Sequence, residues 1–242
     1  MLLNKFSAKL SRRTLLAAGT GAIATGLSTN LLIPNQAVAA TPTLEAATIS
    51  AKQGLQLLME GNRRYVFLHL NHPHQGKSRL LEIAKAQHPF AIILSCADSR
   101  VPPELVFDQG IGDLFVVRVA GNIIDDAVLG SIEYAAEHLN VPLVMVLGHE
   151  RCGAVAAAVA GGKVGAHVST LVKAIQPAVE SVRDKSGDLL DNAVRANIQM
   201  VVKQIKISEP LADLVKSKKL QIVGGRYDLD NGMVEVIAGQ VS

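Results

Sequence analysis

The chain has 242 residues, of which 49 % are apolar and 19 % charged, so it can bury a substantial core and is not a disordered chain. Aromatic residues make up 3 % with no Trp, which argues against base-stacking surfaces, and two cysteines cannot form a disulfide scaffold. The formal net charge is +3, but residues 1–39 hold four of the 24 basic residues and no acidic residue. The rest of the chain has 20 basic and 21 acidic residues and is therefore nearly neutral. This balance indicates neither nucleic acid nor an anionic membrane surface as a partner.

Residues 1–39 are typical of an export signal. A positively charged start ends in Arg12-Arg13, a mildly apolar stretch covers 15–33, and Ala37-Val38-Ala39 offers a cleavage site. The two arginines resemble a twin-arginine signal, which exports folded proteins; a single membrane anchor and an ordinary secretion signal are the alternatives. We expect a mature protein of residues 40–242 in the periplasm or another extracytoplasmic compartment such as a thylakoid lumen. No later segment has the ~20 uncharged apolar residues of a spanning helix, so stable membrane insertion is not expected after cleavage.

From residue 40 onward, helical and strand patterns alternate, with no repeat and no linker to a second domain. Helical spacing covers 44–62, where Gly61-Asn62 is typical of a helix end, and 79–87. Continuous apolar runs, typical of strands buried on both faces, lie at 90–94, 114–119 and 143–147. Further helices are predicted at 125–139, 152–160, 168–183, 189–207 and 209–218, and a late hairpin at 220–224 and 233–238. This order predicts one α/β domain with a mostly parallel central sheet of four to five strands, flanked by helices.

Soft metal ligands follow two of the predicted strands. Cys96 comes directly after the first strand, and His149 and Cys152 follow the strand at 143–147. Ligands bind beyond the carboxyl ends of strands in open parallel sheets, and two thiolates with one imidazole form a catalytic zinc set with an open fourth position. Cys152 would lie near a helix N-terminus, which favours its thiolate. Two ordinary buried cysteines, or a disulfide between them, are the alternatives.

The residues around these ligands form a pattern that resembles the β-class carbonic anhydrases. The resemblance covers roughly residues 45–240. Its motifs are Gly61-Asn62-x-Arg64-Tyr65, Gln87-x-Pro89, Cys96-x-Asp98-x-Arg100, Gly112-Asp113-x-Phe115-Val116-x-Arg118-x-Ala120-Gly121-Asn122, Ser131-Ile132-Glu133-Tyr134-Ala135 and His149-x-x-Cys152-Gly153.

The resemblance implies one zinc ion per subunit, held by Cys96, His149 and Cys152. It implies the reversible hydration of carbon dioxide to bicarbonate and a proton by zinc-bound hydroxide. It also implies a homodimer or tetramer, with the site near a subunit interface. The same zinc set on this fold leaves two other functions open: a hydrolase of CS₂ or COS, and a non-catalytic relative that binds zinc or bicarbonate. A redox protein with a disulfide between its two cysteines is a further alternative.

The resemblance also implies a catalytic pair, Asp98 and Arg100, next to the metal. Asp98 bound to zinc would fill the fourth position and close the site. Held instead by the two-pronged guanidinium of Arg100, it would leave the metal open and accept a hydrogen bond from a molecule bound there. Gln87 is expected to donate an N–H to an oxygen of carbon dioxide as negative charge develops on it.

Overall fold

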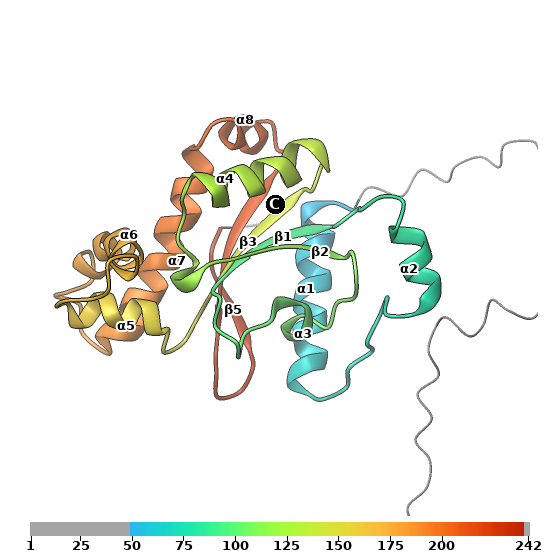
Figure 1. Cartoon of the computed structure of the whole chain (residues 1–242). Helices are drawn as coiled ribbons and strands as arrows, with labels where there is room; N and C mark the ends of the chain where they lie inside the picture. The colour runs from blue at the N-terminus through green and yellow to red at the C-terminus, as the bar shows by residue number, and fades with distance from the viewer. Residues whose placement is uncertain (1–48, 240–242) are drawn as a thin grey trace, which may run out of the picture. The chain divides into compact units, whose positions relative to one another are not determined.

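Five strands form one sheet in the order β2-β1-β3-β4-β5 (Figure 1). The structure, a computed structural model, describes residues 49–239, and the predicted export signal lies outside them. The strands are β1 (Ala91–Ser95), β2 (Leu114–Arg118), β3 (Leu143–His149), β4 (Gln221–Tyr227) and β5 (Val234–Ala238). The first four are parallel, and β5 pairs antiparallel with β4. The expected α/β fold with a mostly parallel sheet is confirmed, including the late hairpin.

Helices follow most of the strands, as the alternating pattern predicts. They are α1 (Ala51–Val66), α2 (Lys77–Ile83), α3 (Pro103–Val106), α4 (Asp126–Glu133), α5 (Gly153–Ala160), α6 (Val168–Glu180), α7 (Leu189–Ile207) and α8 (Leu211–Lys216). A π-helical turn, Tyr134–His138, continues α4, and a short 3₁₀ turn, Ala120–Asn122, follows β2. Within residues 49–239, no helix is both long and apolar enough to cross a membrane.

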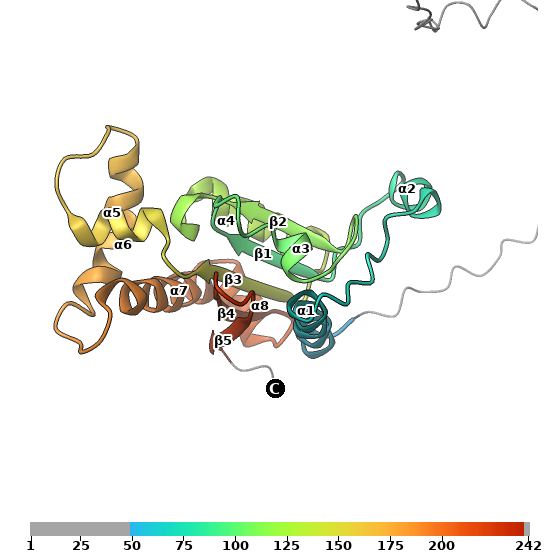
Figure 2. The ribbon, with the colours of Figure 1, turned by 90° about the horizontal axis from the view of Figure 1, so that it is seen from below.

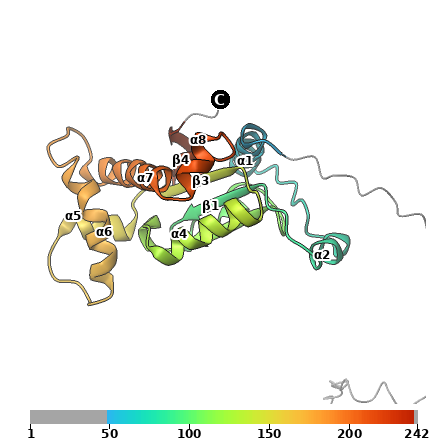
Figure 3. The same ribbon diagram turned by 90° about the horizontal axis from the view of Figure 1, so that it is seen from above.

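The central strands β1 and β3 are buried along their whole length. Because successive side chains of a strand point to opposite faces, both faces of these strands must be covered. On one face, Ile92 and Leu94 of β1 pack in a cluster with apolar residues of α4 and α7. On the other face, Ala91 and Ile93 pack in a second cluster with α1 and α3. All three views place α5 and α6 beyond one end of the sheet and α2 beyond the other (Figures 1, 2 and 3).

The first predicted helix is wrong at its C-terminal end. The helix α1 continues through Gly61 and Asn62 to Val66, and both residues are buried. A side chain on Gly61 would place its Cβ 1.7 Å from the Phe107 carbonyl oxygen, so glycine permits the close approach of α1 to the chain that follows α3. The Asn62 amide donates to the carbonyl oxygens of Val106 and Gly232. These tertiary contacts outweigh the local preference of Gly-Asn for a helix end.

Candidate metal centre

The ends of β1 and β3 bring the predicted ligands together. The two strands are parallel neighbours, with Ser95 opposite Leu147, so their carboxyl ends meet at one edge of the sheet. Cys96 follows β1 directly, His149 is the last residue of β3, and Cys152 is the N-cap residue of α5. All three are buried, with exposed fractions of 4 %, 1 % and 2 %. Residues up to 56 positions apart in the sequence thus form one buried cluster of donor atoms.

The spacing of the donor atoms fits a tetrahedral cation. The two Sγ atoms are 3.9 Å apart, and one ligand atom from each of Cys96, His149 and Cys152 lies within 4.8 Å of the others. Zinc–sulfur bonds of about 2.3 Å at a tetrahedral angle place two sulfurs about 3.8 Å apart. Both cysteines are free, and their separation is far from the ~2.05 Å of a disulfide bond.

The histidine presents the correct nitrogen to this group. The Nδ1 atom of His149 lies 2.9 Å from the carbonyl oxygen of Glu150, which can only accept, so Nδ1 carries the proton. The Nε2 atom therefore keeps its lone pair. It is buried and has no hydrogen-bond partner among residues 49–239. An unpartnered buried acceptor beside two thiols is the donor set that a soft divalent cation satisfies.

The contact between the two thiols shifts their pKa values in opposite directions. The hydrogen bond from Cys152 lowers the pKa of Cys96 to about 4; burial opposes the shift, and the bond from the Gly121 N–H supports it. The same contact and burial raise the pKa of Cys152 above its usual value. The first sulfur thus ionises easily, and the second does so when a cation offsets the two negative charges.

A carboxylate stands beside the donor atoms. Asp98 receives two bonds from the Arg100 side chain, Nε to Oδ1 at 2.9 Å and Nη2 to Oδ2 at 2.7 Å. This fork holds the pKa of Asp98 well below its usual range, so the group is a carboxylate at neutral pH. Its Oδ2 lies 3.7 Å from Nε2 of His149. Arg118 fixes the backbone beneath it by donating to the carbonyl oxygens of Cys96 and Asp98.

Gln87 is not brought to this group within one chain. It is exposed and precedes the amino end of β1, whereas Cys96 follows the carboxyl end. A strand of five residues spans about 16 Å, so the two positions lie at opposite ends of the strand. The structure therefore assembles the three donors with Asp98 and Arg100 and leaves Gln87 apart.

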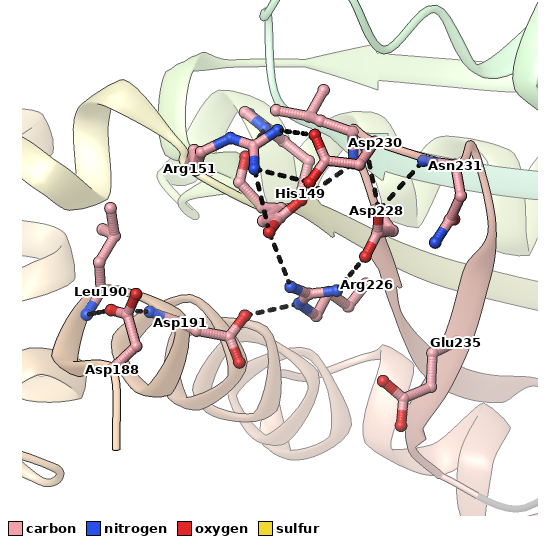
Figure 4. A network of polar contacts seen from close by, with 12 residues as sticks. His149, Arg151, Asp188, Leu190, Asp191, Arg226, Asp228, Asp230, Asn231 and Glu235 are labelled. Atoms are coloured by element: carbon pink, nitrogen blue, oxygen red, sulfur yellow. Dashed lines mark hydrogen bonds and ion pairs between the residues drawn. The ribbon is translucent and has the colours of Figure 1, made fainter.

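A network of charged side chains supports the peptide next to His149 (Figure 4). At its centre Arg226, which is 8 % exposed, contacts Asp191 at 2.7 Å, Asp228 at 3.4 Å and Glu150 at 3.6 Å. Arg151 adds a two-pronged pair with Asp230. The carboxylates of Glu150, Asp228 and Asp230 are close enough to hold a cation, but these arginines already neutralise them. Their contacts instead fix Glu150, whose carbonyl sets the tautomer of His149.

Comparison with known proteins identifies the family. The sequence profile of the carbonic anhydrases matches residues 91–234. The chain is 43 % identical over 180 residues to carbonic anhydrase 2 of Mycobacterium tuberculosis, covering 72 % of this chain and 87 % of that protein. It is 41 % identical over 184 residues to the carbonic anhydrase of Mycolicibacterium smegmatis, covering 74 % and 89 %. The chain belongs to the β-class carbonic anhydrase family.

Solved β-carbonic anhydrases share the fold. A tetrameric β-carbonic anhydrase of the fungus Sordaria macrospora superposes with a TM-score of 0.64 at 23 % identity, covering 77 % of this chain and 98 % of that one. A β-carbonic anhydrase of Aspergillus fumigatus gives 0.57 at 29 % identity, covering 65 % and 79 %. The family profile spans both strands of the metal centre; Gln87 lies before it.

Several groups of this carbonic anhydrase site were absent from the sequence prediction. The Glu150 carbonyl and the Gly121 N–H, which donates to the Cys96 sulfur at 3.2 Å, are backbone groups and leave no side-chain signal. Arg118 belongs to a motif that carries the resemblance, but its contacts with the loop after β1 depend on the pairing of β1 with β2.

Proposed function

We propose that this β-class carbonic anhydrase is a zinc-dependent lyase that interconverts carbon dioxide and bicarbonate at Cys96, His149 and Cys152. The observation that carries the proposal is the tetrahedral spacing of two free sulfurs, 3.9 Å apart, beside an unpartnered His149 nitrogen. When bound by these three residues, a zinc ion would lower the pKa of a water molecule and so supply the nucleophile that carbon dioxide requires.

Asp98 and Arg100 prepare the site for that reaction. Because Arg100 donates to both carboxylate oxygens of Asp98, the carboxylate is held by Arg100 beside the ligand set and is not available to fill the fourth position of a metal. The Oδ2 atom still lies 3.7 Å from the His149 nitrogen, close enough to accept a hydrogen bond from a molecule in that position. Asp98 therefore acts as the acceptor that orients the nucleophile, and Arg100 keeps it charged and in place.

We further propose that the active protein is a homodimer or larger assembly with Gln87 near a subunit interface. Gln87 lies at the wrong end of β1 to act in its own chain, so its amide reaches a metal centre only across an interface. The segment before it supports an interface there: α2 buries no residue, and Phe67, Leu68, Leu80 and Leu81 expose 64 %, 83 %, 49 % and 65 % of their surface. Exposed apolar side chains on one segment are typical of a surface that a partner covers.

The export proposal rests on the sequence alone. Residues 1–39 combine a twin-arginine-like start with an Ala-x-Ala site, and we propose that the mature enzyme acts in the periplasm or a comparable compartment. Export after folding would protect the two free thiols, because the metal would be loaded in the reducing cytoplasm. Fractionation of cells, with N-terminal sequencing of the exported protein, tests both the route and the cleavage site.

The deciding experiment is stopped-flow hydration of carbon dioxide with zinc measured in the same sample. We expect about one zinc per chain, loss of hydration after removal of the metal by a chelator, and recovery on addition of zinc. Assays of CS₂ and COS hydrolysis on the same preparation separate the related hydrolases. Stoichiometric zinc without any of these activities would identify a non-catalytic relative, and a metal-free protein with a disulfide would overturn the proposal.

A further inference from the structure

The Cys96 sulfur receives a hydrogen bond from the backbone. The Gly121 N–H donates to Sγ at 3.2 Å, from the 3₁₀ turn after β2. Such a bond holds the sulfur in place and fixes the direction of its lone pairs toward a metal, and it also lowers the energy of the sulfur electrons. The position of Gly121 therefore bears directly on one of the three proposed metal ligands.

Gly121 occupies a position that only glycine fits. Its φ is +74°, and a Cβ there would lie 2.7 Å from Ile175 Cδ1 and 3.1 Å from the Ala154 Cβ. The side chains of Ile175 and Ala154 therefore leave no room for a side chain at this position. The carbonyl oxygen of Gly121 accepts a hydrogen bond from the amide Nδ2 of Asn197 at 2.9 Å.

Asn197 is an unusual residue for its place in the fold. It lies on the buried face of α7 and is 1 % exposed. The other buried residues of this helix are all apolar: Ala193, Val194, Ile198, Val201, Val202 and Ile205. A buried amide is unfavourable unless its hydrogen bonds are made, and the Oδ1 atom of Asn197 has no partner among residues 49–239. A leucine would pack better at this position than an amide. The contribution of the Asn197 amide is therefore its hydrogen bond to Gly121.

We propose that Asn197 is a positioning residue of the metal centre, whose amide holds Gly121 so that the Gly121 N–H stays directed at the Cys96 sulfur. The inference rests on the proposed function, in which that sulfur binds zinc. It links α7, on one face of the sheet, to a ligand at the end of β1 through two hydrogen bonds. Neither bond involves the zinc ligand's own neighbours in sequence, since Gly121 lies 25 and Asn197 lies 101 positions after Cys96.

The test replaces Asn197 by leucine, which keeps the approximate volume and removes the donor. We expect N197L to bind Zn²⁺ at least about tenfold more weakly in chelator competition, as for other residues that orient a metal ligand. In the Co²⁺-substituted protein, the sulfur-to-metal charge-transfer band should move to lower energy, because the sulfur loses the N–H that stabilised its electrons. A purely structural role would not move this band.

The matched control is N192L on the same helix. Asn192 also donates its amide to a backbone carbonyl, that of Ser186 at 3.0 Å, but this carbonyl precedes α7, and Asn192 is not one of the buried residues of the helix. It should leave the metal affinity and the band unchanged. If N197L does not fold, N197A is the second variant. It also removes the donor, and its smaller side chain leaves a cavity and does not crowd the core.

The outcomes separate this inference from the function it rests on. A wild-type protein that takes up neither Zn²⁺ nor Co²⁺ refutes the proposed function and the role of Asn197 with it. A wild-type protein that binds both metals, with a folded Asn197 variant of equal affinity and an unshifted band, leaves the function standing and overturns the role of Asn197.

Discussion

The metal centre is buried in the sheet, whereas the segment 67–87, here called the arm, lies at the surface. The three donor residues of the centre are buried at the ends of two central strands, and backbone groups bond to the Cys96 sulfur and the His149 ring. The arm lies beside the sheet, and its helix α2 buries no residue (Figure 2). Two buried carboxylates hold the arm: Asp108 accepts from the N–H groups of Asn71 and His72, and Asp113 contacts His74 and Arg79.

The contrast separates the part of the site that a single chain assembles from the part that it leaves apart. Packing of the sheet forces the metal ligands together, so the centre needs no partner to form. The arm exposes apolar side chains and carries Gln87 away from its own centre, so in the assembly proposed above its function depends on a second copy. Changes in the centre should therefore affect metal or turnover, and changes in the arm should affect turnover across the interface or stability, with the metal retained.

Removing a sulfur ligand should break the centre most severely. In C152S, a hydroxyl replaces a thiolate that zinc prefers, and only two strong ligands remain. We expect a folded protein without stoichiometric zinc and with hydration at the background rate. Atomic absorption on the purified variant measures the metal, and circular dichroism checks the fold. One zinc per chain in this variant would remove Cys152 from the ligand set.

Changing Asp98 should separate turnover from metal binding. D98N keeps the size of the side chain but removes the charged acceptor, so hydration should fall about 100-fold or more while zinc stays bound. D230N is the matched control, because Asp230 also forms a two-pronged pair with an arginine near the site but does not face His149. Wild-type rates in D98N, or an equal loss in D230N, would contradict the role of Asp98.

Changing Gln87 tests the arm and the interface together. Q87A should keep its zinc and lose about 100-fold in hydration, the usual effect of removing one donor to developing charge. Mixing Q87A chains with D98N chains should restore activity, because a symmetric hybrid dimer contains one centre with Asp98 in one subunit and Gln87 in the other. Mixtures that stay inactive, despite exchange of subunits shown by mass spectrometry, would place Gln87 outside the site.

Much of the fold follows from local patterns in the sequence. The apolar runs at 90–94, 114–119 and 143–147 correspond to β1, β2 and β3, and the helix expected at 189–207 has the bounds of α7. The spacing of Cys96, His149 and Cys152 behind two such runs led to the donor set that the structure assembles. Residues directly after buried parallel strands are predictable because the sheet itself brings them to one edge.

Other features depend on contacts between distant segments. The end of α1 was placed too early because Gly61 and Asn62 make their contacts with Phe107 and Val106, more than 40 positions later. The role of Asn197 leaves no local signal in the sequence, since its partner Gly121 precedes it by 76 positions. The position of Gln87 relative to the centre depends on the length of β1, which separates Gln87 from Cys96. A sequence motif does not contain this distance.

The smallest expected effect concerns the carboxylate that holds the arm. Burial alone would raise the pKa of Asp108, but the bonds from Arg64 and from the N–H groups of Asn71 and His72 outweigh it and lower the pKa. D108N keeps an acceptor but loses the charge, and should reduce the free energy of unfolding by about 1 kcal/mol. Because the folded-state pKa is the lower one, the advantage of wild type over D108N should be complete above the ordinary pKa of about 3.9 and shrink as the pH falls below it. Urea denaturation of both proteins from pH 7 to pH 3 measures this difference, and a gap that persists unchanged at pH 3 would show that the charge of Asp108 does not stabilise the arm.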